Sequence, residues 1–317
     1  MMIRVLANGA TITVRVCLIC AAVLLAIPAF AFHPLITDDT GTQGKHNVEF
    51  EVAYQFERDT MRWFDRGLDS VLEGTWGKVT TKEDAHELAA TISYGLIDPL
   101  DLVIGVPYGH SRAREARIFY NPPVPMAGLQ GLRYVSTSVD SGIGDPTIEL
   151  KWMFFEHEGL SLALKPGTTL PLGNEDAGFG TGCVSPYLYF IMSYEKDWFL
   201  MHLNLGYIRN QNKVGDREDL YHGSLAMEFV LMKDMLKFVV NTGLERNPDK
   251  RSNFHDVFFL GGFVVSPSEF CDLDLGFKYS LALPGAQSPG PDYSVLAGFT
   301  ARYDGGAKKD EKKEGGK

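Results

Sequence analysis

The feature that constrains this chain most is an alternation of apolar and polar residues, which recurs along residues 46–303. In the clearest run, from His46 to Asp59, every second residue from Val48 to Phe56 is apolar, and the residues between them are mostly acids and amides. A period of two places successive side chains on opposite faces of a β-strand. Because no stretch after residue 32 shows sustained helical periodicity, the sequence predicts an all-β fold.

The alternation divides into about twelve strands, and most of them have the roughly 9–11 residues that a tilted strand needs to cross a bilayer. An even number of antiparallel strands can close into a transmembrane barrel, in which lipid-facing apolar residues alternate with polar lumen residues. The expected strands are His46–Asp59, His86–Tyr94, Asp101–Ser111, Pro146–Phe155, Leu160–Leu170, Cys183–Tyr194, Trp198–Asn210, Tyr221–Leu231, Met235–Glu245, Phe254–Val265, Glu269–Ala282 and Tyr293–Tyr303.

The connections between these strands alternate in length. Short links such as 156–159 and 195–197 alternate with longer polar ones, of which Thr60–Ala85 and Arg112–Asp145 are the longest. An outer-membrane barrel has this asymmetry, with short periplasmic turns and long outer loops, whereas a soluble β-sandwich has no reason for it. The mean hydropathy of −0.07 excludes a bundle of membrane helices but fits a barrel. We therefore expect a transmembrane antiparallel β-barrel with both termini in the periplasm; a soluble periplasmic β-domain is the alternative.

An apolar stretch near the start has the form of an export signal. It runs from Val16 to Phe32, is broken by Pro28, and follows a segment whose only charges are Arg4 and Arg15. It ends in the small-x-small pattern that signal peptidase reads, and before the proline it is shorter than the roughly 20 residues of a membrane helix. We expect residues 1–31 to be a cleaved signal peptide, 32–45 a plug-like periplasmic segment, 46–303 the barrel and 304–317 a disordered charged tail. A single-span anchor is the alternative for the first segment.

The alternation also predicts which charged side chains face the lumen. Acids outnumber bases among them, and such a wall favours cations or neutral solutes over anions. The alternative is that acids and bases pair into a network that fills the lumen. The same excess of acid in the whole chain, 40 acids against 30 bases, makes a nucleic-acid partner improbable. The predicted lumen residues are Glu49, Glu51, Glu57, Glu87, Asp101, Glu149, Lys151, Lys165, His202, Glu228, Asp272, Asp274, Lys278 and Arg302.

The start of the expected mature chain resembles a known bacterial family. The run from Phe32 to Gly44 is similar to the opening of the family described as "Putative MetA-pathway of phenol degradation", whose members are often labelled transporters. The stretches 94–102, 142–146 and 165–173 also resemble this family. The resemblance implies an outer-membrane β-barrel that passes small solutes, including aromatic or other hydrophobic compounds.

The motif that carries this resemblance is expected to fold into or against the periplasmic mouth of the barrel. A metal site built from His33, Asp38 and Asp39 is the alternative, but no second cluster completes its ligand shell, so no metal or cofactor is expected. Asp38 and Gly41 equally suit a turn. The residues assigned to this mouth segment are His33, Pro34, Thr37, Asp38, Asp39, Gly41, Gln43 and Gly44.

The sequence thus predicts a passive outer-membrane channel or transporter, with lipid, small solutes and the barrel-assembly machinery as its partners. That machinery would recognise the C-terminal strand that ends at Tyr303. A structural barrel whose long outer loops meet a surface partner is the first alternative. An outer-membrane enzyme built on His86, His202, His222 and Ser224 is the second, but no nucleophile motif accompanies these residues.

Overall fold

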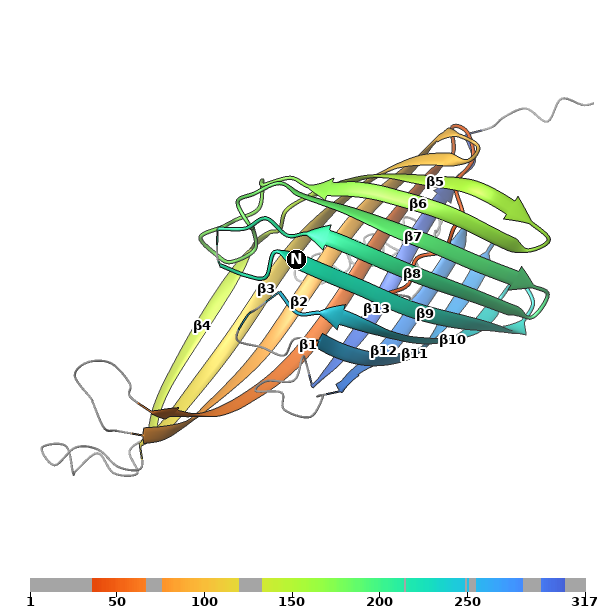
Figure 1. Ribbon diagram of the computed structural model, residues 1–317. Helices are drawn as coiled ribbons and strands as arrows, with labels where there is room; N and C mark the ends of the chain where they lie inside the picture. The colour runs from red at the N-terminus through yellow and green to blue at the C-terminus, as the bar shows by residue number, and fades with distance from the viewer. Residues whose placement is uncertain are drawn as a thin grey trace, which may run out of the picture.

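A computed structural model describes residues 36–66, 76–119, 133–213, 215–248, 250, 255–281 and 292–305. Within these ranges the chain is all-β (Figure 1). No helix in the described part of the chain is long and apolar enough to cross a membrane. The strands are β1 (Val48–Arg66), β2 (Trp76–Ile97), β3 (Leu100–Phe119), β4 (Arg133–Ile143), β5 (Thr147–His157), β6 (Leu160–Thr169), β7 (Ser185–Lys196), β8 (Phe199–Arg209), β9 (Asp219–Met232), β10 (Leu236–Arg246), β11 (His255–Ser268), β12 (Cys271–Leu281) and β13 (Tyr293–Tyr303).

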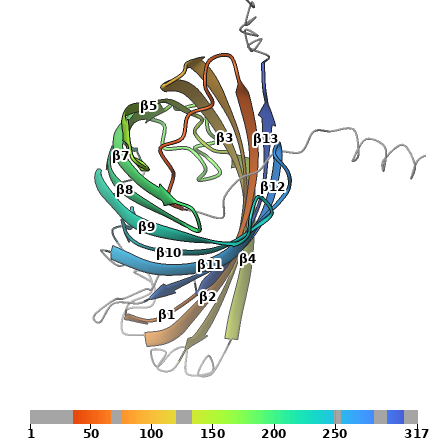
Figure 2. The ribbon, with the colours of Figure 1, turned by 90° about the vertical axis from the view of Figure 1, so that its right-hand side faces the viewer.

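The strands close into one antiparallel barrel, which Figure 2 shows from one end. Each strand from β5 to β13 pairs with the next, β13 pairs with β1, and β1–β2–β3 complete the circle. β4 and β5 are two halves of a single barrel strand, because both pair with the same side of β3. Residues 108–118 of β3 pair with β4, and residues 100–105 pair with β5. The thirteen segments therefore make a twelve-stranded barrel, as the alternation predicts.

The barrel is apolar outside and polar inside. On β12, for example, Asp272, Asp274 and Lys278 are buried, whereas Leu273 and Leu275 are 46% and 60% exposed. Closure pairs every strand with two neighbours, which is required where lipid offers no partner for backbone N–H and C=O groups. The apolar outer surface and the closed ladder identify an outer-membrane β-barrel.

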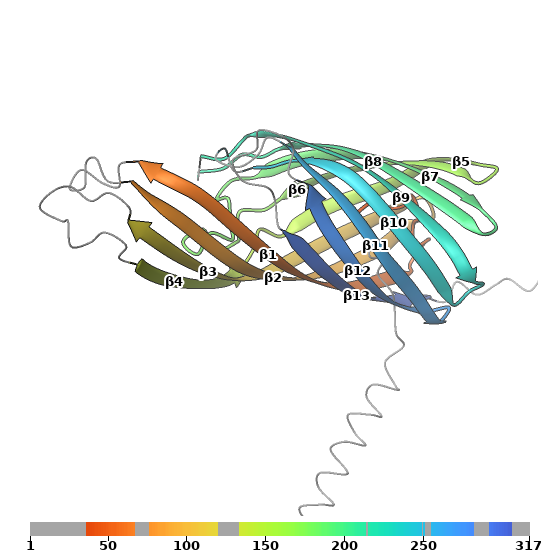
Figure 3. The same cartoon turned by 90° about the horizontal axis from the view of Figure 1, so that it is seen from below.

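The expectation that Thr60–Ala85 and Arg112–Asp145 are loops is wrong. β1 and β2 continue as a hairpin far beyond the barrel wall, and β3 and β4 do the same. We call this four-stranded extension (residues 59–66, 76–85, 111–119 and 133–143) the flange; it projects beyond the other strands in Figure 3. On β1, β2 and β3 many of its outward residues are charged, such as Arg62, Lys82 and Arg114, whereas on β4 Val135 and Val139 are exposed on the same face. The alternation that identifies the other strands is therefore weaker there.

The other connections keep the predicted asymmetry of length. The turns of two or three residues at one end of the barrel place Glu158, Asp197 and Asp234 at φ values of 46°, 41° and 55°. This left-handed backbone fits the twist of tight β-hairpins. The start of β1 and the end of β13 lie at the same end, since Val48 pairs with both Tyr303 and Tyr94.

Candidate functional site

The segment Ile36–Gly44, which we call the mouth segment, lies inside the barrel and is hydrogen-bonded to strands all around its wall. The Thr37 hydroxyl donates to Asn241 Oδ1 of β10 at 3.0 Å. The Thr40 backbone N–H donates to Ser193 Oγ of β7 at 3.0 Å, and the Gln43 N–H donates to Asp101 Oδ2 of β3 at 2.8 Å. The segment therefore crosses the lumen rather than following one wall.

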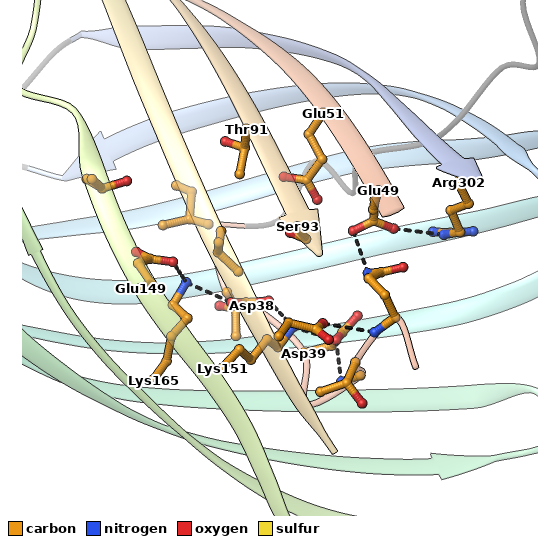
Figure 4. Close-up of a pocket in the computed structure, with 18 residues that line it drawn as sticks. Asp38, Asp39, Glu49, Glu51, Thr91, Ser93, Glu149, Lys151, Lys165 and Arg302 are labelled. Carbon is orange, nitrogen blue, oxygen red and sulfur yellow. Dashed lines mark hydrogen bonds and ion pairs between the residues drawn. The ribbon is translucent and has the colours of Figure 1, made fainter. Parts of the chain in front are cut away.

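Asp38 is the electrostatic anchor of this crossing (Figure 4). Its carboxylate accepts from Lys151 Nζ at 2.9 Å and from Lys165 Nζ at 2.8 Å. Its backbone N–H and C=O are both paired with the Asn204 side-chain amide, at 2.8 and 2.7 Å. Each lysine keeps a second carboxylate at 3.2 Å, Asp39 for Lys151 and Glu149 for Lys165.

The charge on Asp38 is favoured by its neighbours. Burial alone would raise the pKa of the Asp38 carboxyl, but Lys151 and Lys165 outweigh it and hold the pKa below its ordinary value. Asp38 is thus ionised at neutral pH, and the three charged groups act as one ion-paired cluster.

Two glycines let the mouth segment leave the barrel. Gly44 has a φ of 78°, and a Cβ added to Gly95 would lie 1.7 Å from the Gly44 carbonyl oxygen. Only a glycine at position 95 permits this contact. The crossing is held by the His46 N–H, which donates to the Gly95 carbonyl at 2.8 Å. Above it, Thr42 and Lys45 are bonded to Asp98 of the β2–β3 turn.

A cavity of about 570 Å³ lies between the mouth segment and the wall formed by β1, β2, β3, β5 and β6. Figure 4 shows Asp38, Lys151 and Lys165 on one side of it and Glu51 and Thr91 on the other. Six carboxylates and three cationic groups line it, so its charge is acidic. The charged lining residues are Asp38, Asp39, Glu49, Glu51, Asp101, Glu149, Lys151, Lys165 and Arg302.

This cavity, which we call the mouth cavity, is lined by seven of the fourteen predicted lumen residues: Glu49, Glu51, Asp101, Glu149, Lys151, Lys165 and Arg302. Two others, Glu57 and Glu87, line a second space of about 310 Å³ nearer the flange. Arg302 connects the mouth cavity, of about 570 Å³, to β12, because its guanidinium contacts Glu49 at 2.9 Å and Asp272 at 3.5 Å.

The remaining predicted lumen residues fill the interior around β8–β12. Glu228 contacts His202 at 3.5 Å and Lys237 at 2.8 Å. The side chains of His202 and Glu228 are 2% and 1% exposed. Lys278 lies 3.7 Å from Glu245 and over the ring of Phe258. Asp274 is 7% exposed, and neither of its carboxylate oxygens has a hydrogen-bond partner among the described residues. These predicted residues are buried in the interior and do not line the two cavities described above.

Neutral polar residues that bind the mouth segment were not among the sequence-based candidates. Asn204, Asn241, Ser193 and Ser161 all bond to it. Each falls on the lumen face of its strand, so the alternation could have identified them if amides and hydroxyls had been counted with the charges. Of the predicted mouth residues, Thr37, Asp38, Asp39, Gly41 and Gln43 line the cavity, and Gly44 lies where the segment leaves the barrel. His33 and Pro34 lie outside the described residues.

The histidines considered for an enzyme lie in different environments. His222 Nε2 is 2.8 Å from Ser224 Oγ, and its Nδ1 is 3.2 Å from Glu245 Oε1. The order Ser–His–Glu is that of a hydrolase relay, but Ser224 is 3% exposed and lines none of the cavities described above. His86 instead bonds to Tyr54 on the outer face, far from Ser224 in the ladder.

A third cavity, of about 320 Å³, adjoins the mouth segment on the side of β7–β10. Tyr187 and Tyr189 line it with their rings edge to face at 79°, beside Ile208. The Tyr187 hydroxyl donates to Glu149 at 2.6 Å, which connects this partly aromatic space to the charged cluster around Lys165.

Comparison with known proteins agrees with this architecture. The model of the family described as "Putative MetA-pathway of phenol degradation" matches residues 91–284. No curated protein matches the sequence. Among solved structures, the COG4313 outer membrane channel of Pseudomonas putida F1 is similar at a TM-score of 0.54 and 14% identity, covering 84% of this chain and 98% of that one. The toluene transporter TbuX of Ralstonia pickettii gives a TM-score of 0.46 at 9% identity, over 82% of this chain and 90% of that one. Because the family model spans more than half of the sequence, the chain belongs to the phenol-degradation MetA-pathway family, with the fold of an outer-membrane β-barrel.

Proposed function

We propose that the protein is a passive outer-membrane channel for small solutes, closed on its periplasmic side by the mouth segment. The observation that carries this proposal is the acidic cavity of about 570 Å³ inside a closed barrel. The mouth segment that bounds this cavity is held in place by hydrogen bonds and ion pairs, such as those of Asp38 with Lys151 and Lys165. A purely structural barrel needs neither an interior space nor a segment that crosses it.

The charge of the cavity sets the expected selectivity. Its six carboxylates exceed its three cationic groups, and two of those cations, Lys151 and Lys165, are already paired with Asp38. Glu51, on the far side of the cavity, forms no ion pair among the described residues, and Asp101, which is aligned with Lys151 in the ladder, accepts a hydrogen bond from the Gln43 N–H. These two carboxyl groups remain to act on a solute. Cations and neutral solutes should therefore pass more readily than anions.

Neutral aromatic compounds are the first solutes to test. The family description names phenol degradation, and Tyr187, Tyr189 and Ile208 give the third cavity a partly aromatic lining. Aromatic rings favour edge-to-face contacts of the kind that Tyr187 and Tyr189 make with each other. A phenolic hydroxyl could also exchange hydrogen bonds with Glu149.

Assembly of the barrel would follow the usual route for its class. We expect the assembly machinery to recognise β13, whose last residue, Tyr303, is 62% exposed on the outer surface. The tail beyond residue 305 lies outside the described residues.

Reconstitution of the full-length chain tests the proposal. Planar bilayers under a KCl gradient should show discrete conductance with a cation-selective reversal potential, and liposomes should take up phenol faster than protein-free vesicles. A folded barrel, identified by heat-modifiable migration, that neither conducts ions nor accelerates uptake would favour a structural or surface-interaction role. Anion-selective currents would refute the assignment of the acidic wall.

A further inference from the structure

The flange carries opposite charges on its two faces. Residues that point inward include Asp59 and Glu83, which continue the acidic lumen face of β1 and β2. Asp84 is an outward acid, but basic residues predominate among the charged residues on the outward face. They are Arg58, directly before the flange, and Arg62, Lys82, Arg112 and Arg114, which together we call the basic patch. The inward acids include Glu115 of β3 as well.

The strand register gathers the patch into a compact group. Arg58 of β1 is aligned with Asp84 of β2, which is aligned with Arg112 of β3. Two residues further from the barrel, on the same face, Lys82 of β2 is aligned with Arg114 of β3. Neighbouring strands are about 4.8 Å apart, so these side chains can reach a common ligand.

Most of this charge is uncompensated. Arg58 is paired with Asp84 at 2.6 Å. Arg62, Lys82, Arg112 and Arg114 are exposed, and none of them forms an ion pair within the described residues. The chain as a whole is acidic, with a formal net charge of −10, so the basic patch is a local exception.

The position of the patch relative to the apolar belt points to its partner. On the same outer face, one row of the belt consists of Tyr54, Leu88 and Tyr108, which are 37%, 45% and 45% exposed. Arg58 follows Tyr54 by four residues, or about 14 Å along the strand. Aromatic residues of this kind mark the membrane interface, so the basic side chains lie at or just above the level of lipid headgroups.

We propose that the basic patch binds the phosphate groups of the phosphorylated glycolipid in the outer leaflet, while the belt below it contacts the acyl chains of the same lipid. Arginine presents a planar fork that binds phosphate through two hydrogen bonds, and Arg112 and Arg114 each offer one on neighbouring rows of β3. The combination of cations above an apolar surface fits a lipid, because free phosphate would gain nothing from the belt. This inference rests on the outer-membrane location of the barrel and is independent of conduction.

Lipid binding by the full-length chain in detergent tests this site. Native mass spectrometry would follow titrations with bisphosphorylated lipid A and with the same lipid lacking both phosphates. The variant Arg112→Gln/Arg114→Gln removes two outward cations, and Lys196→Gln/Lys233→Gln removes two exposed cations from the opposite end of the barrel. A third variant, Arg112→Lys/Arg114→Lys, keeps the charge but loses the fork. Heat-modifiable migration checks that every variant is folded.

We expect the arginine-to-glutamine variant to bind bisphosphorylated lipid A about 30-fold more weakly, as removal of two membrane-surface cations predicts. The lysine variant should fall between it and wild type, and the opposite-end variant should bind as wild type. Millimolar inorganic phosphate should not displace the lipid. Equal binding by the two glutamine variants, equal affinity for the lipid without phosphates, or displacement by inorganic phosphate would each overturn the proposal.

Discussion

The substitution Asp38→Asn isolates the ion-paired anchor of the mouth segment. It removes the carboxylate that binds Lys151 and Lys165, at 2.9 and 2.8 Å, but leaves the two backbone hydrogen bonds to Asn204 in place. Removing one partner of a buried ion pair costs about 3–5 kcal/mol. Asp38 is 33% exposed, and each lysine keeps a second carboxylate, so we expect roughly 2 kcal/mol here.

A loss of about 2 kcal/mol changes the ratio of released to seated mouth segment by about 30-fold. Single-channel recording in planar bilayers measures this ratio directly as the fraction of time spent in the high-conductance state. Asp234→Asn is the matched control, because it removes one aspartate charge from an exposed turn at the same end of the barrel, and asparagine tolerates the left-handed φ of 55°. An unchanged open fraction in Asp38→Asn, or an equal change in the control, would refute the role of the anchor.

Three further predictions follow from the same geometry. First, the Asp38 anchor should resist acid. Because the pKa of the Asp38 carboxyl is held below its ordinary value, the stabilisation by its ion pairs is present above that ordinary value and is lost only as the pH falls through the lowered pKa. The open fractions at pH 7 and pH 5 should therefore agree, and opening of the channel between these two pH values would contradict this prediction. Second, Gly95→Ala should raise conductance or reduce the folded fraction, since its Cβ would meet the Gly44 carbonyl oxygen at 1.7 Å, while Gly261→Ala, which meets nothing within 4 Å, should behave as wild type in conductance and heat-modifiable migration. Third, Ser224→Ala should leave both conductance and phenol uptake unchanged, because Ser224 is 3% exposed; a loss of uptake with normal folding would reopen an enzymatic role for the His222 relay.

The sequence was sufficient for the barrel because lipid imposes one rule on every membrane-crossing strand. A residue such as Leu273 or Phe277 must be apolar where it faces lipid, and its neighbours Asp272 and Lys278 can be charged only where they face the lumen. This rule ends at the membrane boundary. Beyond this boundary, charged residues such as Arg62 and Lys82 occupy positions on the outer face that are apolar within the membrane. The sequence pattern therefore predicts a polar loop there, although the strands continue.

The charged candidates for the lumen could be predicted, but their partners could not. Alternation assigns Lys151 and Lys165 to the lumen face, yet their partner Asp38 lies 113 and 127 residues away in the chain, in a segment without periodicity. That pairing depends on how the mouth segment crosses the barrel. The crossing in turn depends on the contact between Gly44 and Gly95, for which a single sequence carries no distance information.

Deletion of residues 36–43 tests the central claim most directly, because it removes the mouth segment and leaves every barrel strand and the Gly44–Gly95 contact in place. The deleted barrel, folded by the criterion of heat-modifiable migration, should be recorded beside the wild type in planar bilayers under the same KCl gradient. The account predicts a larger and more persistent conductance, with a reversal potential of the cation-selective sign set by Glu51, Asp101 and their neighbours. An unchanged conductance, or a reversal potential of the anion-selective sign, would contradict it.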